Sequence, residues 1–281
     1  MPMSFAEAIP VDLFRSGQFR WRLLTRAIPE SSWLQVDDQR ETYRAEKAAL
    51  LATRQHDCVV YEPGSDAAAR EVLRLVLTDL SHRGIAADVD DSLHPIDAAG
   101  RLVQEDLVVM ERQERGWVLT SASVCFPTRW DLQSKLGRTM DEIHEPVPQY
   151  AETVAPVVNR FFDRLHVGRL VWRPNWSLVA DPGLRLDPPH RDDEVTFSSD
   201  PGKDLWLRVE RQSVRRLVEN PDAVCFTVRV HRWSLAEILD ELRGSAFADE
   251  LAAIPIDVAE YKNIETIRQQ VRSWMEADSG V

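Results

Sequence analysis

The chain has 281 residues, 44% of them hydrophobic, so it can bury a substantial core within one elaborated domain, residues 1–281. Its formal net charge of −12 argues against a nucleic-acid partner, because phosphate binding needs a basic surface. No apolar run reaches the roughly 20 residues that span a bilayer, and the N-terminus lacks the pattern of a secretory signal. These features predict a cytoplasmic protein without membrane contact.

Apolar residues at helical or alternating spacing predict an α+β protein. Helices are predicted, in chain order, over residues 41–54, 66–83, 96–106, 149–165, 234–243, 246–253 and 263–276. Strands are predicted over residues 107–110, 117–124, 170–179, 205–214 and 223–230. The short connections 110–117 and 216–223 favour an antiparallel sheet. We expect a helical insertion over 125–165 to interrupt this sheet, and helices to cover one of its faces.

The stretch 180–203 is rich in Asp, Pro, Gly and Ser and predicts a long connecting loop, whose length also suits a lid or an oligomer contact. Within it, His190 precedes Asp192 and Asp193. A solvated loop is favoured over an iron site there, because a facial triad needs a second histidine and none is nearby in the sequence.

The three cysteines, Cys58, Cys125 and Cys225, are widely spaced and odd in number. This pattern fits neither a disulfide framework nor a zinc site with paired ligands. We expect buried, small apolar residues rather than reactive thiols.

One histidine stands out because two prolines closely follow it. Pro146 and Pro148 fix their own backbone torsions and bias Glu145 and Val147 away from the helical conformation. We therefore expect His144 to end a short helical turn with a rigid exit. An imidazole on a rigid support suits a metal or heme iron, and the alternative is an ordinary loop or core histidine.

Several short blocks around this histidine and elsewhere occur in one order along the chain. Near His144 they are Phe126-Pro127, Trp130, Lys135-x-Gly137 and Ile143-His144-x-Pro146-Val147-Pro148-x-Tyr150. Elsewhere they are Leu102–Leu107, Asn175–Ser177, Arg208–Gln212, Val224–Arg229 and Tyr261-Lys262. Over roughly residues 10–270, these blocks resemble the heme-dependent oxidative N-demethylase-like family, and several co-ordered blocks are harder to obtain by chance than one motif.

The resemblance implies a PAS-like fold, in which a curved antiparallel sheet carries a helical insertion and flanking helices. It implies heme b between sheet and insertion, with His144 as the iron ligand. It also implies an oxygen-dependent monooxygenase that demethylates a small, dimethylamine-like amine through an unstable carbinolamine and releases formaldehyde. No Gly-x-Gly-x-x-Gly turn follows a predicted strand, so a separate NAD(P)H-linked reductase would supply the electrons.

Alternation along the predicted strands suggests which residues would face the heme. Arg208 and Glu210 share one face of their strand, and Arg211 lies on the other. Arg208 or Arg211 would bind a heme propionate, because a guanidinium pairs well with a carboxylate. The alternative is a cross-strand ion pair with Glu210. Trp130 and Trp176 would wall the porphyrin or, alternatively, fill the core.

A distal carboxylate is expected to orient the amine or move protons. Glu260, beside Tyr261-Lys262, is the first candidate, with an ordinary surface glutamate as its alternative, and Glu210 is the second. Two other functions stay open at this point. One is a non-catalytic PAS-like heme sensor, and the other is a heme-free scaffold.

Overall fold

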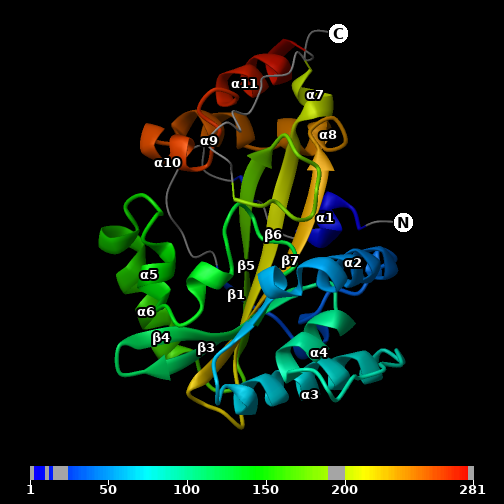
Figure 1. Cartoon of the computed structure of the whole chain (residues 1–281). Helices are drawn as coiled ribbons and strands as arrows, with labels where there is room; N and C mark the ends of the chain where they lie inside the picture. The colour runs from blue at the N-terminus through cyan, green and yellow to red at the C-terminus, as the bar shows by residue number, and fades with distance from the viewer. Residues whose placement is uncertain (1–2, 10–12, 15–24, 189–199, 278–281) are drawn as a thin grey trace.

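The computed structural model describes residues 3–9, 13–14, 25–188 and 200–277, and a seven-stranded antiparallel sheet forms its centre (Figure 1). The strand order is β1-β5-β6-β7-β3-β4-β2. The strands are β1 Arg26–Ala27, β2 Val59–Tyr61, β3 Asp106–Gln113, β4 Gly116–Ser123, β5 Leu170–Val179, β6 Trp206–Arg216 and β7 Ala223–Ser234. The mixed helix and sheet class is confirmed, whereas the likeness to PAS domains stays a prediction.

The helices lie between and after these strands. They are α1 Phe5–Ala8, α2 Arg40–Cys58, α3 Asp66–His82, α4 Pro95–Leu102, α5 Met140–His144, α6 Ala155–Arg164, α7 Pro201–Asp204, α8 Leu239–Arg243, α9 Phe247–Ala253, α10 Ile256–Tyr261 and α11 Arg268–Ala277. Shorter turns are η1 Glu30–Ser32, η2 Gln133–Lys135 and the π-helical turn η3 Tyr150–Val154. Within the described ranges, no helix is long and apolar enough to cross a membrane.

Several of the predicted helices have different bounds in the structure, and the one predicted over 41–54 continues to Cys58. The helix predicted over 96–106 ends at Leu102, because Val103 is already extended and Asp106 pairs with Val228 of β7. The helix predicted over 234–243 begins at Leu239, since β7 continues to Ser234 to pair with β6. The last predicted helix, over 263–276, begins at 268.

Helices cover both faces of the sheet, so the prediction of helices on one face is wrong. Successive strand residues point to opposite faces. Val109 packs into an apolar cluster with α2, α3 and α4, whereas its neighbours Val108 and Met110 pack into another cluster with α6. Because β3 is apolar on both faces, each face needs a helical cover. In Figure 1, α5 and α6 lie on one side of the sheet and α2 to α4 on the other.

A buried ion pair anchors the start of the 125–165 insertion. The Asp106 carboxylate accepts hydrogen bonds from the backbone N–H groups of Cys125 and Phe126, both at 2.9 Å. The Lys47 ammonium lies 3.5 Å from the same carboxylate, and both side chains are 1% exposed. Burial raises the pKa of Asp106, and these donors offset part of that penalty. The insertion therefore leaves β4 from a fixed point.

The predicted loop over 180–203 is partly core. Leu184 and Leu186 are buried, and the backbone of Leu186 bonds to Pro127 (3.0 Å) and Arg129 (2.8 Å). Residues 201–204 form α7. The prediction of a connecting loop is confirmed for residues 180–188, although its two leucines are buried, and it is wrong for residues 201–204, which are helical. His190 and its neighbours up to residue 199 lie outside the described residues.

The three cysteines are free and buried, as expected of small apolar residues. The structure adds one relation that their spacing does not suggest. The Cys58 and Cys125 thiols are hydrogen-bond neighbours, and this bond is the largest cause that lowers the pKa of Cys58.

Candidate functional site

Helix α5 is short, but its position is fixed at both ends of its first turn. The Thr139 hydroxyl accepts a hydrogen bond from the Glu142 N–H (3.3 Å), and the Glu142 carboxylate accepts from the Thr139 N–H (2.7 Å). The preceding residues bond to the edge of β4, where the Gly137 N–H donates to the Leu119 carbonyl at 2.9 Å. His144 is the last residue of this helix, as predicted.

The exit from α5 differs from the prediction at one residue. Glu145 keeps helical torsions (φ −48°, ψ −39°) although Pro146 follows it. The Val147 N–H donates to the His144 carbonyl at 2.9 Å and closes a turn over the proline. This hydrogen bond outweighs the steric preference of a residue before proline. Gln149 then takes a left-handed conformation (φ 60°), and η3 begins at the next residue.

The imidazole of His144 is arranged as a neutral ligand. Its Nδ1 lies 2.8 Å from the Met140 carbonyl oxygen. A carbonyl oxygen can only accept, so Nδ1 carries the proton and Nε2 keeps its lone pair. Burial, the largest cause, lowers the pKa of His144, so the ring is neutral at pH 7. Nε2 makes no hydrogen bond with any described residue.

A tyrosine supports the same ring. Tyr150 stacks on His144 with ring centroids 4.9 Å apart and an angle of 12° between the planes. Its hydroxyl is buried and has no hydrogen-bond partner among the described residues. Metal-binding histidines are commonly oriented by a carbonyl at one nitrogen while the other stays free. His144 has this arrangement on a half-buried side chain that solvent reaches.

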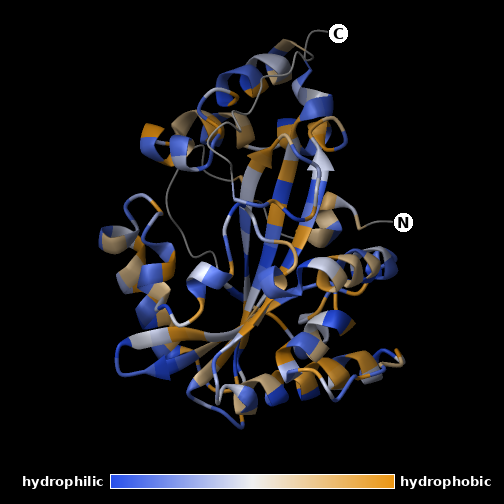
Figure 2. Cartoon of the chain, in the orientation of Figure 1, coloured by the Kyte–Doolittle hydropathy of each residue, from blue (hydrophilic) through white to orange (hydrophobic). Residues whose placement is uncertain are grey.

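A carboxylate with three neutral donors occupies the neighbouring strands. Glu210 of β6 lies opposite Asn175 of β5. Its two carboxylate oxygens accept hydrogen bonds from the Thr128 hydroxyl (2.5 Å), the Asn175 amide (3.2 Å) and the Gln212 amide (2.8 Å). Arg173, Asn175, Glu210 and Gln212 are half-buried, and we call these four residues the polar face. Figure 2 shows blue residues part-way along β6, among orange ones.

Arg173 connects His144 and Glu210 electrostatically. Its positive charge is among the causes that lower the pKa of His144. Burial lowers the pKa of Arg173 itself, and the negative charge of Glu210 opposes that shift. The Arg173 Nε is buried and has no hydrogen-bond partner among the described residues. A guanidinium with an unused donor therefore lies within the electrostatic reach of both groups.

Lys262, which follows α10, carries a second unusual charge beside the polar face. Its ammonium donates to the Trp176 carbonyl at 2.8 Å and lies 5.4 Å from the centroid of that indole ring. Burial lowers the pKa of Lys262 to about 8, although the charge of Glu210 opposes the shift. Near neutral pH this ammonium therefore loses a proton more readily than an ordinary lysine.

The low pKa of Lys262 predicts a pH-dependent stability difference. Between about pH 8 and pH 10.5 the unfolded chain binds more protons at this residue than the folded chain. Relative to Lys262→Met, the wild-type chain should therefore become more stable across this range, by on the order of 1 to 3 kcal/mol. Urea unfolding of both proteins at the two ends of the range measures this difference.

The control for this comparison is Lys203→Met, because Lys203 is exposed. Tyrosines and cysteines that titrate in the same range are common to all the proteins and cancel in the difference. A wild-type stability that stays parallel to that of Lys262→Met would contradict the buried ammonium.

Arg208 shares a face with Glu210, as predicted, but its guanidinium already donates hydrogen bonds to other protein groups. It is 1% exposed and donates to the carbonyls of Phe126 (2.9 Å), Leu184 (2.8 Å) and Gly183 (3.2 Å), and to the Thr128 hydroxyl (2.9 Å). These bonds hold the start of the insertion against the sheet. Within the described residues Glu210 forms no ion pair, so the cross-strand pair considered as the alternative is not seen.

Arg211 and Trp176 lie on the face opposite the polar face. Arg211 pairs with Pro174 in the sheet register and donates to the carbonyls of Trp33 (3.0 Å) and Ser32 (2.5 Å). Trp176 packs edge-on against Phe247 in the apolar cluster beneath α9. The structure therefore does not bring either residue together with His144, and Trp176 is a partly buried residue at the margin of the apolar cluster.

The remaining two candidates, Trp130 and Glu260, differ in their burial. Trp130 and Ile143, the residue before His144, are both partly buried and pack against the same apolar cluster. Glu260 is exposed on α10, and its carboxylate makes no hydrogen bond or ion pair with the described residues. Of the two candidate carboxylates, only Glu210 belongs to the polar face.

The donor set fits a heme better than a bare metal ion. Among the described residues, no group of three or more His, Cys, Asp or Glu side chains could hold a metal ion. A heme iron needs only one protein ligand, because the porphyrin supplies four nitrogens. The free Nε2 of His144 provides that ligand, and the unpaired Nε of Arg173 provides a donor for a propionate.

Arg173 is the residue that sequence analysis missed. The alternation of strand residues places Arg173 on the same face as Asn175, and this alternation is the only sign of its position that the sequence offers. Its proximity to Glu210 depends on the pairing of Arg173 with Gln212 across β5 and β6, and that register is not visible in the sequence.

The chain matches the model of a known protein family. A family model described as "Haem-dependent oxidative N-demethylase, alpha subunit-like" matches residues 84–272. The matched range, more than half of the chain, contains His144, the polar face and Lys262. It begins later than the resemblance over residues 10–270 suggests. No curated protein matches the chain.

Proposed function

Because the chain belongs to the heme-dependent oxidative N-demethylase, alpha subunit-like family, we propose that it is the heme b component of an oxygen-using N-demethylase. Its substrate is a small, dimethylamine-like amine, and one methyl group leaves as formaldehyde. The main support is the His144 imidazole, whose Nδ1 is hydrogen-bonded to a carbonyl and whose Nε2 has no hydrogen-bond partner within the described ranges. A bound heme would supply the activation of dioxygen with electrons from outside.

Two residues would hold the heme in this proposal. His144 would bind the iron through Nε2, because this nitrogen is neutral and the ring is fixed by Met140 and Tyr150. Arg173 would donate to a propionate, because its Nε has no hydrogen-bond partner in the described part of the chain and the side chain is half-buried. It replaces Arg208 and Arg211 in this role, since their guanidinium groups already bind backbone carbonyls.

Glu210 is the proposed acid and base. An amine with a lysine-like pKa of about 10 is protonated at neutral pH, so an anionic Glu210 would attract it and take the proton from its nitrogen. This transfer frees the nitrogen lone pair. When the carbinolamine collapses, its hydroxyl proton is lost, the C–N bond breaks and the nitrogen regains a proton, which Glu210 can return.

Lys262 is the proposed second proton carrier. Its pKa of about 8 lets it exchange a proton near neutral pH, and the charge of Glu210 acts on it. The electrons come from a separate NAD(P)H-linked reductase in this proposal. The order of the two candidate carboxylates is thus the reverse of the one predicted from sequence, because Glu260 is exposed and Glu210 is not.

One preparation tests the proposed function and its alternatives. The chain is expressed with ample heme, purified and examined by absorption spectroscopy, where a Soret band is expected. With dioxygen, dimethylamine and an NADPH-fed electron carrier, formaldehyde should accumulate in proportion to the amine consumed. Reversible binding of ligands to the heme without formaldehyde would indicate a sensor, and a colourless protein would indicate a heme-free scaffold.

A further inference from the structure

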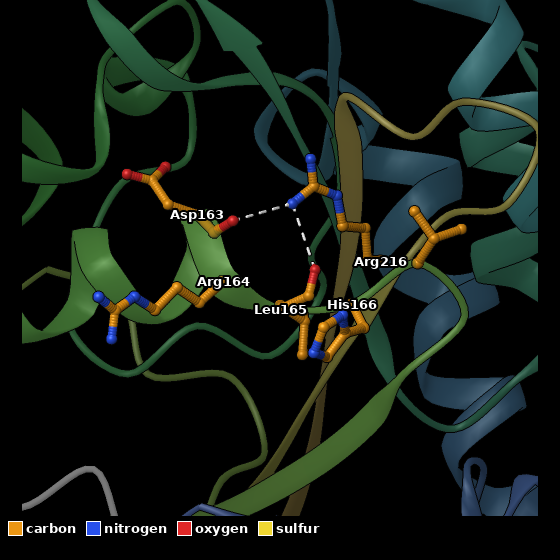
Figure 3. A pocket seen from close by; sticks show the side chains of 6 residues that line it. Asp163, Arg164, Leu165, His166 and Arg216 are labelled. Atoms are coloured by element: carbon orange, nitrogen blue, oxygen red, sulfur yellow. Dashed lines mark hydrogen bonds between the residues drawn. The ribbon is translucent and has the colours of Figure 1, made fainter.

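Two adjoining shallow depressions lie along α6 and the turn that follows it. They share Arg164, Leu165 and His166 in their linings. The second depression also includes Arg160 and Arg169. Figure 3 shows the first, with the Arg164 side chain extending away from Arg216. We call Arg160, Arg164 and Arg169 the arginine patch.

The three arginines of the patch are exposed and make no ion pair or side-chain hydrogen bond with the described residues. Their acidic neighbour Asp163 already pairs with Arg112. Arg216, by contrast, donates hydrogen bonds from its guanidinium to backbone carbonyls. Its bonds to the carbonyls of Asp163 and Leu165 are drawn in Figure 3. The patch therefore keeps its positive charge.

This charge is unusual in its context. The whole chain carries a formal charge of −12, yet three guanidinium groups without an ion-pair partner among the described residues lie within ten residues. Arg160 and Arg164 are four residues apart on α6, where like charges repel and slightly destabilise a helix. A negatively charged partner would remove that repulsion.

Apolar side chains accompany the arginines. Val157 and Val167 are 52% and 50% exposed. Phe161 is half-buried and lines the second depression together with Val157. Protein interfaces combine arginine and aromatic residues with an apolar centre. A nucleic acid or an anionic membrane would need a wider basic surface, and the net charge of −12 opposes both.

We propose that the arginine patch is the docking surface for an acidic, one-electron carrier protein. The inference rests on the proposed function, which requires electrons from outside the chain. Helix α6 continues directly from η3, and Tyr150 at the start of η3 stacks on His144. A carrier bound at the patch thus lies on the same continuous helical segment that supports the proposed iron ligand.

The test uses oxidised plant-type [2Fe–2S] ferredoxin as an acidic probe and cytochrome c as a basic one. Calorimetric titration measures the binding of each to the full-length chain at low and high salt. Ferredoxin should bind and cytochrome c should bind more weakly, and raising the salt concentration should weaken ferredoxin binding. Binding needs neither turnover nor heme, so it fails or succeeds separately from the proposed function.

Charge reversal locates the surface. The variant Arg160→Glu/Arg164→Glu/Arg169→Glu should weaken ferredoxin binding about tenfold or more and keep the Soret band of the heme-loaded chain. Its control is Arg70→Glu/Arg74→Glu/Arg272→Glu, which changes the net charge equally at two exposed positions on α3 and one half-buried position on α11. That control should bind within about twofold of wild type after correction for net charge.

Three outcomes would overturn the proposal. One is no binding of ferredoxin by the wild-type chain, and the second is equal weakening in both triple variants. The third is patch-dependent binding to phosphatidylserine vesicles without binding to ferredoxin, which would assign the patch to a membrane surface instead.

Discussion

Replacing His144 with alanine is expected to abolish the Soret band of the chain purified with heme. The axial bond to iron is lost, and no other described histidine combines a free Nε2 with a carbonyl-bonded Nδ1 in the insertion. Absorption spectra of the two proteins, normalised to protein concentration, measure the effect. Added imidazole should restore part of the band, because it can occupy the vacated position.

His94→Ala is the matched control for this experiment. His94 is also half-buried and also stacks on a tyrosine, with its ring centroid 4.0 Å from that of Tyr61. Its Nδ1, however, accepts a hydrogen bond from the Ile96 N–H, as an N-cap does. This variant should keep the full band. An unchanged spectrum in His144→Ala, or an equal loss in both variants, would refute the assignment.

Glu210→Gln is expected to reduce formaldehyde formation by about 10² to 10⁴-fold, the usual contribution of a positioned acid or base. Glutamine keeps the shape of the side chain but cannot take a proton from the amine. The heme content should stay at the wild-type level, because Glu210 is not proposed to contact the iron. Rates of formaldehyde release at saturating carrier and dioxygen measure the effect.

Glu260→Gln separates the two candidate carboxylates. Glu260 is exposed and unpaired among the described residues, so this variant should turn over at close to the wild-type rate. Activity that survives in Glu210→Gln and vanishes in Glu260→Gln would show that Glu260 is the acid and base, as predicted from sequence. Glu210 would then have no catalytic role.

The position of His144 was predictable because its determinants are local. The spacing of Pro146 and Pro148 indicated the end of a short helical turn, which the structure confirms. The N-terminal signal of α5, Thr139 followed by Glu142, lies three residues apart in the sequence. Nδ1 meets the carbonyl of Met140, four residues earlier on the same helix. Each of these contacts depends on chain neighbours alone.

The polar face was predictable only in part, because it joins distant segments. Alternation correctly placed Arg208 and Glu210 on one face of β6 and Arg211 on the other. The partners of Glu210 come from elsewhere, since Thr128 precedes it by 82 residues and Asn175 by 35. Pairing register and loop path determine these contacts, and neither has a local signal.

Buried polar residues explain why the predicted C-terminal end of the helix over 96–106 is wrong. Gln104, Glu105 and Asp106, the last three residues of the helix predicted over 96–106, are each 1% exposed and lie beyond the end of α4. Their partners lie far along the chain, as Lys47 does for Asp106. Such residues are stabilised by tertiary contacts that overrule local propensity.

A crystal structure of the heme-loaded chain would show whether His144 binds the iron. We expect a porphyrin beside the polar face, its iron bonded to Nε2 of His144 and one propionate bonded to Arg173. Iron bonded to any other residue, or a His144 ring enclosed by protein with no macrocycle beside it, would contradict the account.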